Sequence, residues 1–179
     1  MNAWECRPFT AHTHQGMLIA GGVIPMEAIR LANMNDVARC AELLAILFAQ
    51  EHEFTPDPAR QSKGLEMIIA SPACGRVLVY DAEGIIQGMV LLLFTVSTAL
   101  GSRVAILEDM IVSPDFRGKG VGTRLREKAI QLAIDNGCAR ITLLTDHDND
   151  AAHLFYSEGG FSRSNMVVFR RILEPRGME

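Results

Sequence analysis

The sequence predicts a fold of the α/β kind (α+β), with about four helices and a sheet of about six to seven strands. Two long apolar runs, 85–96 and 103–112, have the β-branched composition of strands. Two other segments, 34–50 and 123–136, place apolar residues at the spacing of an amphipathic helix. The chain has 179 residues, of which 49% are hydrophobic, so one domain with a single core is expected.

The first elements have clear start signals. Residues 27–32 alternate between apolar and polar side chains, as a strand does. Asn33, with Asp36 three residues later, can cap the helix over 34–50. A second helix over 58–70 has its proline in the first turn, where proline is tolerated best. A strand followed by two helices is therefore expected at this end of the chain.

The rest of the chain contains the turns of a sheet and two more helices. The segment Asp81-Ala82-Glu83-Gly84 has hairpin chemistry. The flanking runs 76–80 and 85–96, followed by 103–112, therefore predict an antiparallel meander. The later elements are a helix over 123–136 stopped by Gly137, a strand over 141–145, a helix over 150–157 that ends at Gly159-Gly160, and a strand over 165–172.

Charge, hydropathy and cysteine usage argue against several functions. A net charge of −4 and a pI near 5.7 argue against a nucleic-acid-binding surface. The longest apolar run, 89–96, is far too short to span a membrane. The chain has four cysteines without a C-x-x-C pair, Cys6, Cys40, Cys74 and Cys138. This usage indicates reduced, mostly buried thiols in a cytoplasmic protein.

The first 25 residues differ from the rest of the chain. They show no sustained hydrophobic period and no convincing signal peptide. We interpret 1–25 as an arm or extension and 26–174 as a single domain. His12 and His14 lie in the arm without further ligands nearby, so no metal site is expected.

The run Arg117-Gly118-Lys119-Gly120-Val121-Gly122 predicts an anion site between a strand ending at Val112 and a helix beginning near Thr123. Glycine lacks the Cβ that would hold a ligand away. Backbone N–H groups of such a loop can therefore converge on a phosphate at the positive end of the next helix. The glycine spacing matches neither the P-loop nor the Rossmann fingerprint. The predicted ligand is phosphorylated, but this run alone does not name it.

Two motifs together point to one family. The loop fits [RQ]-x-x-G-x-[GA] at Arg117, Gly120 and Gly122. A later segment fits N-x-x-A-x-x-[LF]-Y-x-x-x-G-F at Asn149, Ala152, Phe155, Tyr156, Gly160 and Phe161. With these motifs and the order of elements over 27–172, the sequence resembles the GNAT superfamily of acyl-CoA-dependent N-acetyltransferases.

The resemblance implies a central mixed, mostly antiparallel sheet, splayed in the middle between the strand ending at Val112 and the strand over 141–145. Acetyl-CoA would lie in that cleft as a co-substrate. Its pyrophosphate would be held by backbone N–H groups of Arg117, Gly118, Lys119, Gly120, Val121, Gly122 and Thr123. The backbone at Ile111 and Val112 would pair with the pantetheine arm, which Asn149 would also contact. No metal is implied, and a homodimer is compatible with the family.

Glu108 is our candidate for the general base that accepts the proton of the attacking amine. It interrupts an apolar strand, where a carboxylate would be partly removed from water. Strict alternation would send Glu108 and Asp109 to opposite faces of the sheet, unless a bulge intervenes. Asp109 would then share its face with Leu107 and Ile111. Transfer of the proton through water and a purely structural carboxylate are the alternatives.

Tyr156 matches the family's general acid, a phenol that would protonate the departing thiolate. A core tyrosine beside Phe155 is the alternative. For the acceptor, the acids Glu51 and Glu53 together with Asp109 would favour an amine that carries positive charge, on a small molecule or a peptide. A non-catalytic acyl-CoA-binding or regulatory module, and a binder of another phosphorylated ligand, are the rival functions.

Overall fold

The computed structural model describes residues 27–50 and 54–173, in two compact units that divide between Leu144 and Thr145. Each unit is described by itself. The first contains β1 (Glu27–Leu31), a 3-10 turn (Met34–Asp36), α1 (Val37–Phe48), α2 (Pro58–Ala70), β2 (Gly75–Ala82), β3 (Ile85–Ser97), β4 (Ser102–Val112), a second 3-10 turn (Pro114–Phe116), α3 (Val121–Asp135) and β5 (Cys138–Leu143). The second contains α4 (Asp150–Glu158).

The strands of the first unit form one mixed sheet in the order β1-β2-β3-β4-β5. All neighbours are antiparallel except β4 and β5, which run parallel. Glu83 and Gly84 turn the chain between β2 and β3 with φ of 56° and 82°, the left-handed conformations that a tight hairpin requires. The α+β class, the mostly antiparallel sheet and the four α-helices are confirmed.

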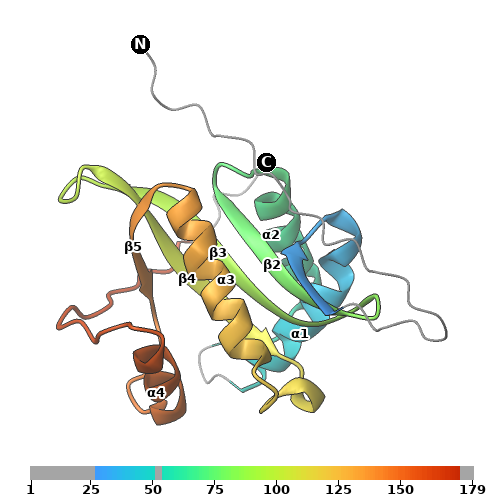
Figure 1. The fold of residues 1–179 in the computed structure, drawn as a ribbon. Coiled ribbons are helices and arrows are strands. Elements are labelled where there is room, and N and C mark those ends of the chain that lie inside the picture. Colours follow the sequence, from blue (N-terminus) through green and yellow to red (C-terminus); the bar gives the residue numbers. More distant parts are fainter. Residues whose placement is uncertain (1–26, 51–53, 174–179) are drawn as a thin grey trace, which may run out of the picture. The chain divides into compact units, whose positions relative to one another are not determined.

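Helices cover both faces of this sheet, as Figure 1 shows. On one face α1 and α2 enclose the main core, where Leu43, Leu44 and Leu65 pack against strand residues such as Met89 and Leu91. On the other face lies α3, whose Leu125 approaches β3 so closely that a Cβ on Gly88 would be 3.0 Å from it. The two apolar faces therefore explain why the central strands are buried on both sides.

The start of α1 is fixed by polar contacts that the sequence predicted in part. Asn33 and Asp36 form the expected capping box, with the Asn33 N–H donating to Asp36 at 2.8 Å. Arg30 of β1 binds the same carboxylate at 2.7 Å and also Asp81 of β2 at 2.8 Å. This contact with Arg30 lowers the pKa of Asp36, against the opposing effect of burial. The capping group of α1 is therefore joined to the sheet edge.

One predicted strand is absent and several predicted boundaries move. The strand expected over 141–145 lies at Cys138–Leu143, and the helix expected over 34–50 ends at Phe48 after a 3-10 turn. Residues 165–172 form no strand, so the described chain has five strands instead of about six to seven. Val167 and Phe169 in that segment are 75% and 92% exposed. A β-branched composition favours a strand, but a strand also needs a neighbour for its backbone, and composition does not supply one. The helix expected near Thr123 begins at Val121.

Several expectations fall on residues that the structure does not describe. The proposed arm over 1–25 is among them, as are Cys6, Glu51 and Glu53. The single domain over 26–174 therefore stays a prediction. Within the described ranges, the helices are all too short or too polar to cross a membrane.

Candidate active site

A β-bulge interrupts β4 at the two acids. Met89 of β3 pairs with Ile111, and Leu91 pairs with Glu108, so two steps along β3 match three along β4. Asp109 lies in the bulge and has a φ of 46°, in the left-handed region. A residue other than glycine adopts that conformation rarely, although Asp and Asn tolerate it better than most. The bulge redirects the side chains on either side of it.

This bulge is the exception named for strict alternation, so the two acids do not lie on opposite faces. Directly paired residues point to the same face, so Glu108 lies on the face of Leu91, toward α1 and α2. Asp109 lines a pocket on that face together with Leu91. The extra residue places Ile111 there too, in the α1–α2 core, whereas Leu107 pairs with Leu92 on the other face. Glu108 is exposed, so the expected removal of its carboxylate from water is not observed.

The sheet opens along β4 after its central residues. Parallel pairing with β5 ends at Leu107 and Leu143, whereas β4 continues to Val112. At Ile111 and Val112 the described sheet gives β4 a strand neighbour on the β3 side only. This is the location where the sequence predicted a splayed sheet, and an extended ligand could pair with the backbone there.

The glycine loop has the geometry of an anion cradle. Gly118 and Gly120 adopt φ of 70° and 76°, and a Cβ built on either would meet no atom of the protein within 4 Å. Gly120 precedes α3 directly, and the first bond across the helix start is from Arg124 N–H to its carbonyl, at 3.1 Å. The N–H groups of 121–123 come before that bond, so they are the orphan donors of the helix start.

The two basic residues of the loop are held back toward the protein. The Arg117 Nε donates to the carbonyl of Val112 at 3.0 Å, which ties the loop to the end of β4. The Lys119 ammonium lies 4.9 Å from the centre of the Phe116 ring, a cation–π distance. Both contacts stabilise the loop in the absence of any ligand charge. The two side chains therefore brace the loop, and its backbone N–H groups are the candidates for binding an anion.

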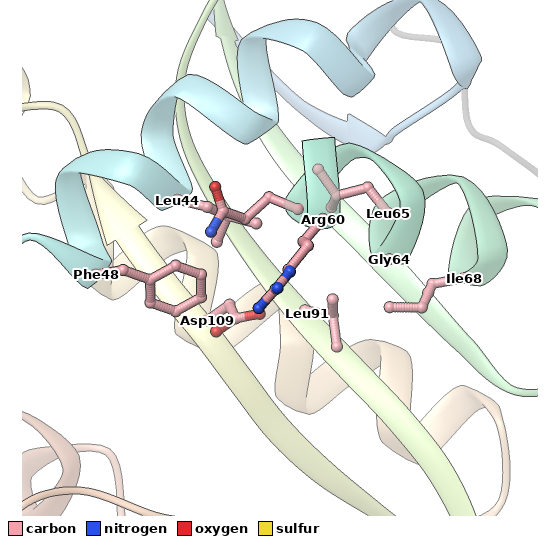
Figure 2. A pocket seen from close by; sticks show the side chains of 9 residues that line it. Leu44, Phe48, Arg60, Gly64, Leu65, Ile68, Leu91 and Asp109 are labelled. Carbon is pink, nitrogen blue, oxygen red and sulfur yellow. The ribbon is translucent and has the colours of Figure 1, made fainter. Parts of the chain in front are cut away.

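A pocket of about 250 Å³ lies beside the bulge, between α1, α2 and the sheet. Its lining consists of Leu44 and Phe48 from α1, Arg60, Gln61, Gly64, Leu65 and Ile68 from α2, Leu91 from β3, and Asp109 from β4. In Figure 2 the Arg60 side chain extends across the pocket, with its guanidinium directed toward Asp109. The described lining is thus mostly apolar, with one acidic side chain, Asp109, and one basic side chain, Arg60.

The second unit contains the other predicted site residues, Asn149 and Tyr156. The side-chain oxygen of Asn149 accepts the Ala152 N–H at 3.0 Å, so this residue caps α4. The Tyr156 ring is half-buried and packs edge-on against Phe155 and Phe161, at centroid distances of 5.1 and 5.7 Å. The three aromatic residues of this motif therefore form one small cluster, next to the helix that Asn149 caps.

Comparison with known proteins gives the family. The model of the Acetyltransferase (GNAT) family matches residues 37–161. The chain belongs to the GNAT family of N-acetyltransferases. A similar protein is YhfO of Bacillus subtilis, an uncharacterised N-acetyltransferase that is 32% identical over 143 residues, which cover 78% of this chain and 93% of YhfO. The resemblance inferred from the two motifs is confirmed.

Solved structures have the same fold. A possible acetyltransferase from Clostridium difficile 630 superposes with a TM-score of 0.76 at 16% identity, covering 83% of this chain and 99% of that one. The aminoglycoside N-acetyltransferase AAC(6')-Iy in complex with CoA superposes with a TM-score of 0.69 at 20% identity, covering 87% and 99%. At these identities the similarity shows the GNAT fold and leaves the acceptor unidentified.

The sequence reasoning missed the α2 side of the pocket in this N-acetyltransferase. Arg60, Gly64 and Ile68 are spaced four residues apart and therefore lie on one face of α2. A signal was present, because an isolated glycine in the middle of a predicted helix costs stability and often has a packing or functional reason. That signal marks a position but not what lies opposite it, so it could not have located the pocket.

A second missed group joins β1 to the helix that follows the cradle. Arg124 of α3 binds Glu27 at 3.0 Å and stacks over the buried ring of Tyr80 at 5.1 Å. A hydrogen bond from the Tyr80 hydroxyl and the contact with Arg124 lower the pKa of Glu27, while burial raises the pKa of Tyr80. The first turn of α3 is thus anchored to the far edge of the sheet, next to the cradle.

The described cysteines are free thiols. Cys40 is buried in α1, and burial raises its pKa to about 12, so it is unreactive at neutral pH. Cys138 is partly buried and Cys74 is exposed, so the expectation of mostly buried thiols is met only in part. Among the residues of 27–50 and 54–173, no three His, Cys, Asp or Glu side chains are grouped as a metal site would require.

Proposed function

We propose that this N-acetyltransferase transfers the acetyl group of acetyl-CoA to the amine of a small-molecule or peptide acceptor, by direct attack in a ternary complex. The observation that carries the proposal is the anion cradle at the start of α3, next to the open edge of β4. A diphosphate and an extended amide-containing arm, joined in one molecule, match these two features. CoA contains both groups.

The residues present fit acetyl-CoA. The empty space beside the left-handed Gly118 and Gly120 lets a pyrophosphate approach the N–H groups of the loop and of 121–123. Ile111 and Val112 would pair with the pantetheine amides through the backbone. Arg117 and Lys119 would add charge from their outer atoms, and Asn149 would contact the arm through its side-chain amide nitrogen.

The reaction joins the acceptor nitrogen to the thioester carbonyl carbon. The carbon–sulfur bond then breaks and the sulfur leaves as a thiolate. A base must take one proton from the amine, and an acid must give one to the thiolate. A well-placed acid or base typically contributes about 10² to 10⁴ in rate.

For the base we propose Glu108, with Asp109 and a water as the alternatives. The bulge turns both carboxylates toward the pocket face, so either one can serve the same amine. For the acid we propose Tyr156. We also propose that the Asp109 carboxylate binds the ammonium group of the acceptor before that group loses its proton. Glu51 and Glu53 are further candidates for contact with the acceptor.

The direct test is acetyl-CoA turnover, followed by free thiol, against a broad panel of amines. Thiol release that depends on one class of amine, with the acetylated amine as product, supports the proposal. Binding of CoA measured by calorimetry, without thiol release from any amine, would favour a non-catalytic module. Binding of another nucleotide in preference to CoA would overturn the assignment of the cradle.

Tyr156→Phe tests whether Tyr156 acts as the acid, as distinct from a role in binding acetyl-CoA. Because only the phenol proton is lost, we expect kcat to fall by about 10² while the acetyl-CoA dissociation constant stays within about twofold. Phe155→Leu, which changes the same aromatic cluster but keeps the phenol, is the matched control and should retain most activity. Unchanged turnover of Tyr156→Phe would remove this residue from the mechanism.

A further inference from the structure

The pocket beside the bulge has an unusual balance of chemistry for a site that was expected to bind cations. Five of its nine lining residues are large and apolar: Leu44, Phe48, Leu65, Ile68 and Leu91. Among the lining residues that the structure describes, Asp109 is the one acid and Arg60 the one base. A guanidinium at the mouth would repel a polycation and attract an anionic group of the ligand.

We infer that the acceptor is a zwitterionic amino-carboxylate with an apolar side chain, such as an apolar α-amino acid. This inference rests on the proposed function, since it names the acceptor class of the same site. The ligand's ammonium is bound by Asp109, its carboxylate by Arg60, and its side chain by the apolar floor. A volume of about 250 Å³ suits a ligand of this size better than a large oligosaccharide.

Asp109 is positioned for the amine. The bulge gives it a φ of 46° and directs its side chain into the pocket, next to the part of β4 where the sheet opens. An ammonium bound by this carboxylate would lie between the apolar part of the lining and the proposed pantetheine path. The amine would thus be presented to the thioester, and the rest of the ligand would be directed toward α1 and α2.

Arg60 is positioned for the carboxylate. It lies in the first turn of α2, where Asp57 caps the helix and binds the Arg60 Nε at 2.9 Å. That contact orients the guanidinium, and the side chain is 88% exposed, so its two terminal nitrogens can reach a ligand. Two parallel bonds from arginine are the usual way in which proteins recognise a carboxylate. The positive end of α2 favours an anion at the same place.

The proximity of the two charges sets the spacing within the ligand. Both line one small pocket, and Figure 2 shows the guanidinium of Arg60 directed toward the carboxylate of Asp109. A ligand that binds both therefore carries its amine and its carboxylate close together. An α-amino acid meets this requirement, whereas a long ω-amino acid or a diamine does not.

The experiment compares amines that differ only in the carboxylate. Leucine is tested against isoamylamine, phenylalanine against phenethylamine, and spermidine represents the polycations. We expect kcat/KM to be at least about tenfold higher for the amino acid of each pair. Arg60→Gln should reduce this ratio to about two or less, because KM rises for the amino acids, which lose the partner of their carboxylate, and does not rise for the plain amines, which have no carboxylate. Lys63→Gln removes an exposed charge from α2 outside the pocket lining and should keep the ratio.

The outcomes separate this inference from the proposed function. Thiol release that is fastest with spermidine or with the plain amines, or an amino-acid preference that Arg60→Gln leaves intact, overturns the inference alone. If no amine is acetylated, the proposed function fails. Calorimetric titration of leucine and isoamylamine into the CoA-saturated protein then decides the inference. Leucine binding that weakens about tenfold in Arg60→Gln supports it, and equal affinity for the two ligands overturns it.

Discussion

The loop proposed to hold the cofactor and the pocket proposed to hold the acceptor are built in different ways. The cradle is a continuous segment, 117–123, in which backbone groups are the proposed ligands and glycine permits the geometry. The pocket takes side chains from α1, α2, β3 and β4, and its acid is directed by a bulge. A site made of continuous backbone can be recognised from the spacing of residues in the sequence. A site made of side chains from distant segments depends on how the helices and strands pack together.

This difference has a functional consequence within one enzyme family. The cradle must fit the same diphosphate in any relative that uses CoA, so local geometry is sufficient. A pocket that binds the acceptor must fit a molecule that differs from one enzyme to another, so the proposed site depends on individual side chains. Substitutions in the loop should therefore affect the cofactor, and substitutions in the pocket should affect the acceptor.

The largest expected effect is that of Gly120→Val on the cofactor. A β-branched residue is strongly disfavoured at a φ of 76°, so the loop must change its backbone and move the N–H groups at the start of α3. We expect acetyl-CoA to bind at least about 100-fold more weakly, which corresponds to roughly 2.7 kcal/mol. Lys119→Ala, which removes a charge but no backbone geometry, should weaken binding only about threefold. Isothermal titration calorimetry measures both.

Gly84→Val is the matched control for this substitution. Gly84 has a φ of 82° and equally open space around it, but it lies in the β2–β3 turn away from the cradle. It should lose stability like Gly120→Val and still bind acetyl-CoA normally. If Lys119→Ala is the more damaging of the two loop variants, the cradle works through side-chain charge, and the contrast with the pocket disappears.

Gly64→Leu in the pocket should have a smaller effect, which falls on the acceptor and not on acetyl-CoA. A Cβ on Gly64 meets no protein atom within 4 Å, so the leucine extends into the space of the acceptor. We expect KM for the acceptor to rise about tenfold, with an unchanged acetyl-CoA dissociation constant. The helix should gain up to about 1 kcal/mol, because leucine is the better helix former.

Steady-state kinetics and thermal unfolding measure these two changes in Gly64→Leu. Gly64→Ala should give the stability gain with little change in KM, since a methyl group fills less of the pocket. A melting temperature that rises while KM for every acceptor stays constant would show that the acceptor binds elsewhere.

The smallest expected effect is on the stability of the fold, through Asp36 at the start of α1, a helix that lines the pocket. The pKa of Asp36, at the start of α1, lies below its ordinary value of 3.8, chiefly because of its hydrogen bonds with Arg30. The ionised form therefore favours the folded state above about pH 4, and this stabilisation is lost as the pH falls through the folded pKa. Asp36→Asn should remove about 1 kcal/mol at pH 7, a modest amount because Arg30 is partly exposed and keeps Asp81.

Urea unfolding at several pH values tests this prediction. The difference between wild type and Asp36→Asn should shrink below about pH 4, where the wild-type carboxylate is protonated as well. Because Asp36 begins α1 and lies outside the loop, acetyl-CoA affinity should stay constant in the folded variant. A stability difference that is independent of pH would show that the carboxylate charge does not contribute.

Some elements were predicted correctly from the sequence and others were not, for physical reasons. Capping signals and hairpin chemistry depend on neighbours within a few residues, so α2 was predicted with its observed ends, Pro58–Ala70, and the β2–β3 turn was predicted in place. The strand expected over 165–172 failed because its composition said nothing about a partner. The faces of Glu108 and Asp109 could not be decided, because one extra residue in β4 reverses the alternation.

By itself, the sequence determined the family, the left-handed glycine loop before α3 and the order of most elements, since spacing, turn chemistry and glycine positions act locally along the chain. Only the tertiary structure decided that both acids of β4 turn to one face and that Arg60 stands at the mouth of the same pocket. Those facts depend on strand register and helix packing, which bring together residues some fifty positions apart. The proposed acceptor therefore follows from the packing of α2 against the bulge, and the cofactor from the glycines before α3.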